Sequence, residues 1–295
     1  MIIPYPHISP VAFHVGPIAV RWYGIMYVLG YAVGDAMAKW RSRRGLWTLD
    51  REAVDSLVGY LVIGMLVGAR LVYVLVYDWP AYREHPLRVF ALWQGGLSFH
   101  GAAIGMAVAC AVFAWRRRVP WRMLTDGLAV CATPGLFLGR IGNFINAELY
   151  GRPTQVPWAM VFPTDPVGVP RHPSQLYQAL TEGLVLGALL LWLQSRIARR
   201  AAASGTIRDG YLSAAFLIGY GVLRFFVEFT RQPDAQLGFV LDGLSMGQLL
   251  CILMIAAGVV MLVVVRTSAP RRALDPLMLA ETPSRTAPPE SEHRE

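Results

Sequence analysis

Long apolar stretches recur along almost the whole of this 295-residue chain, and short polar segments separate them. A helix needs about 20 mostly apolar residues to cross a lipid bilayer, and seven stretches reach that length. The polar segments between them are too short to build a large soluble domain. We therefore predict an all-α integral membrane protein with seven transmembrane helices. The stretches are Ile18–Ala38, Asp55–Tyr77, Gln94–Trp115, Trp121–Ile145, Ser174–Arg196, Gly210–Phe229 and Leu244–Val265.

The basic residues alternate between the connections of these predicted helices. Arg and Lys crowd the first, third and fifth connections, whereas the second, fourth and sixth hold only one or two each. Positively charged connections stay on the cytoplasmic side of a membrane. This predicts an extracytoplasmic N-terminus and a cytoplasmic C-terminus. The net charge of +8 follows the connections, so it indicates orientation in a membrane rather than binding of nucleic acid.

Two polar segments predict structure outside the membrane. Residues 146–173 form the longest outward connection; they are rich in Pro and contain Trp158 and Phe162. This composition predicts a small, ordered extracytoplasmic cap. Residues 268–295 carry Pro, Ser, Arg and Glu and cannot bury a core, so we expect a disordered cytoplasmic tail. Residues 1–267 then form one seven-helix transmembrane domain that includes the cap.

The glycine and cysteine patterns predict packing rather than chemistry. Glycines four residues apart recur in the predicted helices and favour close approach of helix backbones in lipid. All three cysteines fall inside predicted helices, where a small packing residue is a better interpretation than a thiol nucleophile. Neither Cys-x-x-Cys nor His-Glu-x-x-His is present, so we expect no metal site. The glycine pairs are Gly30 with Gly34, Gly64 with Gly68, Gly101 with Gly105, and Gly183 with Gly187.

Polar and ionisable side chains interrupt several apolar stretches near one end. An ionised side chain at mid-bilayer costs about 2.5–3.5 kcal/mol even on lenient scales, so such residues mark a functional site by default. With helices oriented as above, these residues fall at the same outer depth, where Tyr23 also opens the first helix. We therefore predict one polar site just beneath the extracytoplasmic surface. The interrupting residues are His100, Arg140, Asn143, Glu148, Tyr220, Arg224 and Glu228.

The residue types in this set favour a phosphate ligand. Arginine guanidiniums bind phosphate oxygens through paired hydrogen bonds and stay charged, and at a leaflet boundary the available phosphate is that of a phospholipid headgroup. Histidine titrates near neutral pH, so His100 could accept a proton. Amides and phenols, namely Asn143, Asn146, Tyr23 and Tyr220, could hold a glycerol moiety. These residues alone support lipid-headgroup chemistry and lipid or anion transport equally.

Each of these residues also has a purely structural interpretation. Arg140 and Arg224 lie close enough to the interface for their side chains to reach water, and Glu228 could pair with either. The remaining alternatives are a backbone hydrogen bond for His100, helix capping for Asn146 and Glu148, and structural support for Arg70.

Five blocks of sequence favour one of these functional hypotheses. Residues 21–24, 95–101, 139–154, 171–177 and 224–234 read RWYG, GGLSFHG, GRIGNFINAELYGRPT, RHPSQLY and RFFVEFTRQPD. Together and in this order they resemble the signature of the bacterial prolipoprotein diacylglyceryl transferases. The blocks extend from the first predicted helix to the connection after the sixth, which makes the resemblance specific.

This resemblance implies a seven-span enzyme of the bacterial plasma (inner) membrane with its active site on the extracytoplasmic side. Such an enzyme transfers the sn-1,2-diacylglyceryl group of phosphatidylglycerol to the lipobox cysteine thiol of a prolipoprotein signal peptide. A thioether forms, glycerol phosphate is released, and no cofactor is required. The competing hypothesis is a non-catalytic phospholipid carrier or flippase that uses the same arginine-lined cavity.

The resemblance also implies roles for individual residues. His100, Arg224 and Tyr23 would be catalytic, and Arg140 would contact the phosphate of phosphatidylglycerol. Two departures from the family pattern stand out: Gln178 replaces a frequent acidic residue, and Ala147 replaces a common glycine, a change we interpret as conservative. The further substrate-binding positions would be Asn143, Asn146, Glu148, Gly151, Tyr220, Glu228 and Arg231.

Overall fold

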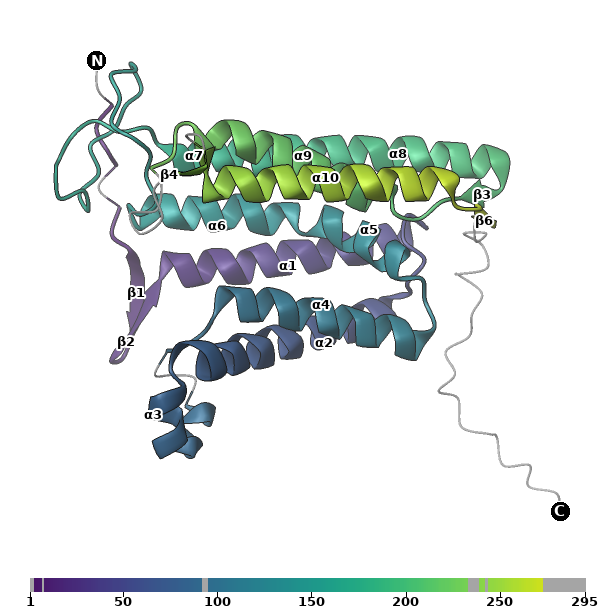
Figure 1. The fold of residues 1–295 in the computed structure, drawn as a ribbon, viewed down its shortest axis with the longest axis horizontal. Coiled ribbons are helices and arrows are strands. Elements are labelled where there is room, and N and C mark those ends of the chain that lie inside the picture. Colours follow the sequence, from purple (N-terminus) through teal and green to yellow (C-terminus); the bar gives the residue numbers. More distant parts are fainter. Residues whose placement is uncertain (1–2, 7, 92–94, 233–238, 242–243, 273–295) are drawn as a thin grey trace.

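The computed structural model describes residues 3–6, 8–91, 95–232, 239–241 and 244–272, and it consists mainly of long helices lying side by side (Figure 1). The described residues also form three two-stranded antiparallel ladders: β1 (Val11–Val15) with β2 (Ile18–Arg21), β3 (Thr206–Ile207) with β6 (Arg271–Arg272), and β4 (Phe239–Leu241) with β5 (Leu244–Ser245). The helices are α1 (Trp22–Arg43), α2 (Arg51–Val72), the π-helical η1 (Tyr73–Tyr77), α3 (Trp79–Glu84), the 3₁₀ helix η2 (Pro86–Phe90), α4 (Phe99–Arg117), α5 (Trp121–Cys131), α6 (Thr133–Ile145), α7 (Ser174–Gln178), the π-helical η4 (Ala179–Val185), α8 (Leu186–Ser204), α9 (Tyr211–Glu228) and α10 (Met246–Thr267).

Five helical segments among the described residues are long and apolar enough to cross a membrane. They coincide with five of the seven predicted stretches, and α1 and α4 occupy the positions of the other two. A mostly helical membrane protein is thus confirmed, whereas the full number of seven spans stays a prediction. The five segments are Arg51–Tyr77, Trp121–Ile145, Ser174–Ser204, Tyr211–Glu228 and Met246–Thr267.

One predicted boundary was wrong and one predicted stretch is interrupted within its confirmed bounds, each for a local reason. Ile18 belongs to strand β2, because Gly16 (φ 57°) turns the chain so that Val15 pairs with Ile18. The stretch Trp121–Ile145 divides into α5 and α6 at Ala132. Pro134 stands in the first turn of α6 and has no amide hydrogen to continue the helical hydrogen bonding.

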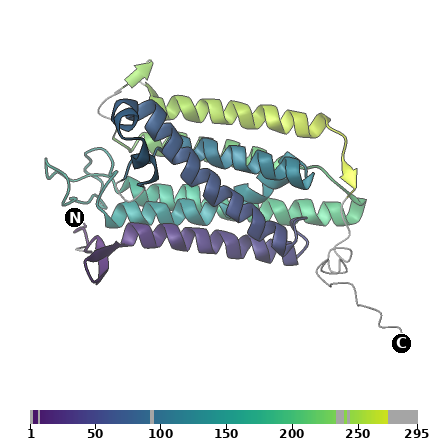
Figure 2. The same cartoon turned by 90° about the horizontal axis from the view of Figure 1, so that it is seen from below.

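The helices define two ends of the bundle (Figures 1 and 2). One end carries β1, β2, α3 and residues 146–173, and we call it the cap end. Strands β3 and β6 lie at the opposite end, where α8 and α10 finish. Helices α1 and α4 begin at the cap end, while α6 and α9 end there. The predicted tail, residues 268–295, lies outside the described residues from position 273 onward.

Glycine contacts bring helix backbones together, as the four-residue spacing predicted. Gly64 and Gly68 of α2 face Gly105 and Gly101 of α4, and a Cβ atom at any of the four would overlap a backbone oxygen of the facing helix. Close approach of this kind is what small residues permit between helices in lipid. The other pairs behave likewise: Gly30 and Gly34 pack against Gly135 and Cys131, and Gly183 and Gly187 pack against Phe137 and Thr133.

Arg70, in the last turn of α2, supports the connection that leads into α4. Its buried guanidinium donates hydrogen bonds to five backbone carbonyls of that connection. A buried guanidinium needs such partners, so the structural interpretation of Arg70 accounts for its position. The same contacts hold the chain just before His100. The acceptors are the carbonyl oxygens of Arg88, Val89, Ala91, Gly95 and Gly96.

One carboxylate joins α5 to the start of α9. Asp126 accepts hydrogen bonds from the amides of Gly210 and Ser213, both at 2.7 Å, and from the Ser213 hydroxyl at 2.7 Å. The first amides of a helix have no partner within that helix. Asp126 therefore caps α9 from a neighbouring helix and fixes where α9 begins.

Residues 146–173 pack against the end of α6 through an aromatic cluster and are braced internally by an ion pair. Phe162 is buried, and its ring lies 5.3 Å from that of Tyr5 and 6.2 Å from that of Phe144, measured between centroids. Arg171 pairs with Asp165 through two contacts, Nε to Oδ2 at 2.6 Å and Nη2 to Oδ1 at 2.9 Å. The Arg171 guanidinium holds the pKa of the Asp165 carboxyl below its usual value.

We predict that Asp165→Asn lowers the melting temperature at neutral pH by at least about 5 °C, because breaking a buried pair leaves one charge uncompensated. The pKa of Asp165 is lower in the folded state than in the unfolded chain, where it is about 3.9. The ion pair therefore stabilises fully above about pH 5, and its contribution is lost as the pH falls through the folded value.

The measurement is thermal unfolding in detergent from pH 7 to pH 3. The difference between wild type and Asp165→Asn should shrink below about pH 4. Glu84→Gln, at an exposed carboxylate of α3, serves as the control and should show no such difference at neutral pH. A deficit of Asp165→Asn that does not change with pH would contradict the ion-pair explanation.

Candidate active site

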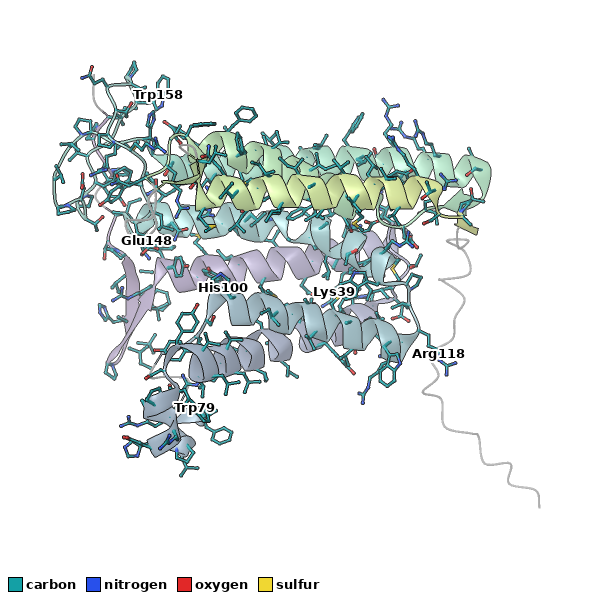
Figure 3. The ribbon with its side chains drawn as sticks, viewed as in Figure 1. Lys39, Trp79, His100, Arg118, Glu148 and Trp158 are labelled. Atoms are coloured by element: carbon teal, nitrogen blue, oxygen red, sulfur yellow. The ribbon has the colours of Figure 1, made fainter. Side chains whose placement is uncertain are left out.

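The candidate site lies at the cap end, where helices of opposite direction bring polar residues together. α1 begins there and carries Tyr23 in its first turn, while α6 and α9 end there, with Arg140 five residues before the end of α6 and Arg224 four residues before the end of α9. Figure 3 shows Glu148 at the end of α6 and His100 toward the same end of the bundle. The antiparallel order therefore gathers residues that are far apart in the sequence.

Two arginines from different helices meet at a single buried carboxylate, that of Glu182 in η4. Arg140 Nη2 lies 3.9 Å from Glu182 Oε2, and Arg224 Nη1 lies 3.8 Å from Glu182 Oε1. The Glu182 side chain has no solvent exposure. The Tyr220 hydroxyl interacts with the same carboxylate. The arrangement concentrates positive charge at one point inside the bundle.

A second carboxylate, Glu228, holds Arg224 from its own helix. Arg224 Nη2 lies 2.8 Å from Glu228 Oε2, and Arg231 Nη1 lies 3.8 Å from the same oxygen. The Ser245 hydroxyl donates to Glu228 Oε1 at 3.1 Å. The predicted pairing of Glu228 with an arginine is thus confirmed for Arg224. We call Arg140, Arg224, Arg231, Glu182 and Glu228 the arginine cluster.

The local structure explains why Glu182 reaches these arginines. Gly183 lies so close to α6 that a Cβ atom there would overlap Phe137, one turn before Arg140. The segment also leaves the regular α-helical pattern and continues as the π-helical η4. Such π-bulges are frequent at functional sites. Close packing at Gly183 therefore brings Glu182 within reach of Arg140.

Sequence reasoning missed Glu182, although a signal was present. It is an acidic residue in an otherwise apolar stretch, and its neighbours four residues away are Gln178 and Leu186. An acidic residue in a membrane span with no basic residue at helical spacing indicates a partner on another helix. Gln178 is itself buried one turn before it, so a carboxylate absent at position 178 is present one turn later.

A second group of site residues surrounds Glu148. Asn143 Nδ2 donates to Glu148 Oε1 at 2.7 Å, and Asn146 Nδ2 lies 3.4 Å from the same oxygen. Tyr23 interacts with the side chain of Asn143 and shares a hydrogen bond with Tyr27 at 2.9 Å between hydroxyl oxygens. These contacts form a chain of hydrogen-bonding groups around the Glu148 carboxylate, and Asn143 stands on the same helix as Arg140 of the arginine cluster.

The backbone conformation of Ala147 is unusual for an alanine. Ala147 has φ 53°, a left-handed conformation that glycine adopts readily and alanine does not. The replacement of glycine by Ala147 is therefore not conservative for the backbone, contrary to our interpretation from sequence. The Thr164 hydroxyl donates a hydrogen bond to the Ala147 carbonyl, which helps hold the turn.

Gly151 joins the cap to the chain after α9. Its amide donates to the His172 carbonyl at 2.8 Å, and its backbone forms an antiparallel bridge with Arg231. A Cβ atom at Gly151 would overlap the carbonyl oxygen of Thr230. Gly151 thus has a packing reason to be glycine, and it positions the backbone that carries Arg231.

His100 stands in the first turn of α4 and is exposed. Ser98 caps this turn through a hydrogen bond from the Gly101 amide at 3.2 Å, and Gly101 packs against Gly68. The position of His100 therefore depends on the close contact between α2 and α4. The structure places it at the same end as the arginine cluster (Figure 3).

The arginine cluster can bind an oxyanion. Arg224 Nη1 is buried without a hydrogen-bond partner of good geometry, and the Arg140 side chain keeps 23% of its surface exposed. Guanidinium donors left available in an apolar bundle match the oxygens of a phosphate group. No group of three or more His, Cys, Asp or Glu residues suited to a metal ion occurs in the part of the chain that the structure describes.

Comparison with known proteins agrees with this chemistry. Residues 10–264 match the family model described as prolipoprotein diacylglyceryl transferase. Similar proteins named phosphatidylglycerol--prolipoprotein diacylglyceryl transferase occur in Bordetella parapertussis (48% identity over 258 residues, 87% of this chain and 95% of the relative), Gluconobacter oxydans (45% over 261, 88% and 93%) and Pseudomonas putida (48% over 260, 87% and 94%). Since the match covers every helix that supplies the arginine cluster, this chain belongs to the prolipoprotein diacylglyceryl transferase family.

Proposed function

We propose that this membrane protein transfers the diacylglyceryl group of phosphatidylglycerol to the cysteine thiol of prolipoproteins, the activity for which its relatives are named. The observation that carries the proposal is the meeting of Arg140 and Arg224, from α6 and α9, at one buried point. Both guanidiniums keep donors for a phosphate group there. The thiol belongs to the lipobox segment of the prolipoprotein signal peptide.

The charge of the arginine cluster fits one phosphodiester. Its three guanidiniums and two carboxylates leave one net positive charge when all are ionised. The phosphodiester of phosphatidylglycerol carries one negative charge, so its binding neutralises the cluster. A buried site favours such neutrality because an uncompensated charge in an apolar bundle is costly.

The reaction is a displacement at carbon. The cysteine sulfur attacks the glyceryl carbon that bears the phosphate ester, a C–S bond forms and the C–O bond breaks. The electron pair of that bond stays on the phosphate oxygen, so the departing glycerol phosphate gains one negative charge. Arg140 and Arg224 stabilise this growing charge, as fixed donors do in other active sites.

The remaining site residues accept the thiol proton and bind the glycerol part of the headgroup. His100 accepts the thiol proton, since an imidazole can take a proton near neutral pH. Tyr23, Asn143 and Glu148 form a chain of hydrogen-bonding groups that holds glycerol hydroxyls. The other assignments follow from the contacts above: Asn146 supports Glu148, Tyr220 contacts Glu182, Glu228 holds Arg224 and Arg231, and Gly151 positions the backbone of Arg231.

The same family and helices support a location in the bacterial inner membrane with the cap end outward. The arginine-rich connections after α1, α4 and α8 lie at the end opposite the cap; Arg118 marks it in Figure 3. Positive connections stay on the cytoplasmic side. This arrangement, with seven spans and an extracytoplasmic N-terminus, lets phospholipid and signal peptide reach the site from the outer leaflet.

We predict that Arg140→Ala and Arg224→Ala each lower the rate of transfer by about 100-fold to 1000-fold, the usual effect of removing one donor to a developing oxyanion. The measurement is the mass of a lipobox peptide after incubation with the purified protein and phosphatidylglycerol. Wild type should add one diacylglyceryl unit to the cysteine. Arg196→Ala, at an exposed arginine stacked on Trp192 of α8, is the control and should keep full activity.

The same assay separates the enzyme from a lipid carrier. Movement of phosphatidylglycerol between leaflets without any adduct on the peptide would favour the carrier and overturn the proposal. Transfer that is equal in wild type and both arginine variants would overturn the role of the cluster.

We also predict that His100→Gln lowers transfer by about 100-fold or more, because general-base catalysis contributes about 10²–10⁴-fold. Binding of phosphatidylglycerol should be unchanged, since the arginine cluster is intact. The matched control is His85→Gln, at an exposed histidine after α3. Full transfer activity in His100→Gln would exclude the role of base.

A further inference from the structure

Glu182 is a buried charge that the displacement reaction does not itself use. Its carboxylate lies inside the bundle, and the arginines described around it come from α6 and α9 rather than from its own helix. A buried carboxylate without partners would be costly or would take up a proton. Its placement between two site arginines therefore needs a reason.

The distances around Glu182 differ from those around Glu228. Arg140 and Arg224 lie 3.9 Å and 3.8 Å from Glu182 oxygens, beyond the usual 2.7–3.2 Å of a hydrogen bond. Arg224 lies only 2.8 Å from Glu228. Neither Glu182 oxygen nor Arg224 Nη1 has a hydrogen-bond partner of good geometry. Glu182 thus attracts both guanidiniums while leaving their donors available.

We propose that Glu182 is a positioning residue that keeps Arg140 and Arg224 side by side and sets the net charge of the cluster. Two guanidiniums repel each other, and the carboxylate between them offsets that repulsion. It also limits the cluster to one net positive charge. This favours a phosphodiester with one negative charge over a phosphate monoester with two, so the product leaves more readily. The inference rests on the proposed function.

Replacing Glu182 by Gln keeps the size and removes the charge. The two arginines then repel each other, so the turnover number should fall by about tenfold or more. The cluster gains one net positive charge, so doubly charged anions should bind more tightly. We expect the inhibition constant of inorganic phosphate to fall at least about threefold, while KM for phosphatidylglycerol does not rise.

Glu182→Asp provides the second variant, because it keeps the charge on a shorter side chain. Inhibition by phosphate should stay at the wild-type level, and turnover should lie between those of wild type and Glu182→Gln. Glu52→Gln, at an exposed carboxylate in the first turn of α2, is the control and should change neither quantity. The melting temperature of each variant is measured to check that it is folded, so that activities are compared between folded proteins.

The outcomes separate this inference from the proposed function. Unchanged turnover and phosphate inhibition in Glu182→Gln would overturn the inference. Equal loss of turnover in both variants with unchanged phosphate inhibition would reduce Glu182 to a packing role and also overturn it. Absence of any peptide adduct with the wild-type protein would instead overturn the proposed function.

A second and separate feature lies at the end of the bundle opposite the cap. A cavity of about 810 Å³ lies between α8, α9 and α10, which run side by side in Figure 1. Leu189, Leu193 and Leu262 contribute apolar walls, and three arginines line the cavity as well. The arginines, Arg200, Arg208 and Arg266, come from α8, the connection before α9, and α10.

The shape and charge of this cavity match one type of ligand. Leu189 and Arg200 are eleven residues apart on α8, so the walls extend for about 16 Å at 1.5 Å per residue. Arg208 donates to the Arg266 carbonyl at 3.1 Å, which holds two of the arginine-bearing segments together. We infer that the cavity binds one anionic phospholipid, with an acyl chain along the leucines and its phosphate at the arginines. Basic pockets between membrane helices bind anionic headgroups in this manner.

The test uses phosphatidylserine, an anionic lipid, against zwitterionic phosphatidylcholine in detergent micelles. Phosphatidylserine should raise the melting temperature of wild type more than phosphatidylcholine does. The triple variant Arg200→Gln, Arg208→Gln, Arg266→Gln should lose most of that excess. Any occupancy of the cap-end site is common to both proteins, so it cancels in the comparison.

Two further variants test whether the effect comes from this cavity. A control with Arg116→Gln, Arg196→Gln and Arg199→Gln removes three exposed arginines that do not line the cavity, and it should keep the excess. Ala215→Phe fills the apolar part of the cavity and should lose it. The inference is overturned if the triple variant keeps the full additional rise in melting temperature, or if the control variant loses as much of it. It is also overturned if inorganic phosphate alone raises the melting temperature as much as phosphatidylserine does.

Discussion

The attraction between arginines and buried carboxylates from different helices is the constraint on which the rest of this structure depends. Arg140 and Arg224 lie within 4 Å of Glu182, inside a bundle whose surroundings are apolar. Removing one partner from a buried ion pair is strongly destabilising because the other charge is left alone. The helices must therefore be held in positions that keep these charges together. The same arrangement suits the proposed phosphate ligand, since donors that face one point in an apolar medium attract anions strongly.

Close contacts between helix backbones hold the helices in the positions that keep these charges together. Gly183 and Gly187 pack against Phe137 and Thr133, so η4 and α8 approach α6 closely enough for Glu182 to reach Arg140. Gly68 and Gly101 do the same for α2 and α4 and thereby place the first turn that carries His100. Asp126 fixes the start of α9 by accepting its first amides. A helix with a fixed start and regular rise carries Arg224 to a defined depth, about four turns later.

The cap completes the site from outside the bundle. The aromatic ring of Phe162 packs against Phe144 at the end of α6, and the Asp165–Arg171 pair braces residues 146–173 internally. Gly151 then brings this segment against the chain that carries Arg231. Apolar helices alone would leave the arginine cluster open at this end. The cap thus links the residues around Glu148 to those around Glu228.

Hydropathy and charge along the chain were enough to predict a helical membrane protein, close glycine contacts and a set of polar residues near one end. These features are local, because apolar length, glycine spacing and the sign of charge can be counted along a single segment. Helix interruptions at Ala132 and η4, the left-handed Ala147 and the structural role of Arg70 required the tertiary structure. So did Glu182, whose partners lie 42 residues away on either side in Arg140 and Arg224. The sequence by itself determined which segments are apolar enough to enter a membrane and which residues would be costly there. Only the packing of helices decided which charges meet, because that depends on rotations and contacts between segments that no single stretch contains.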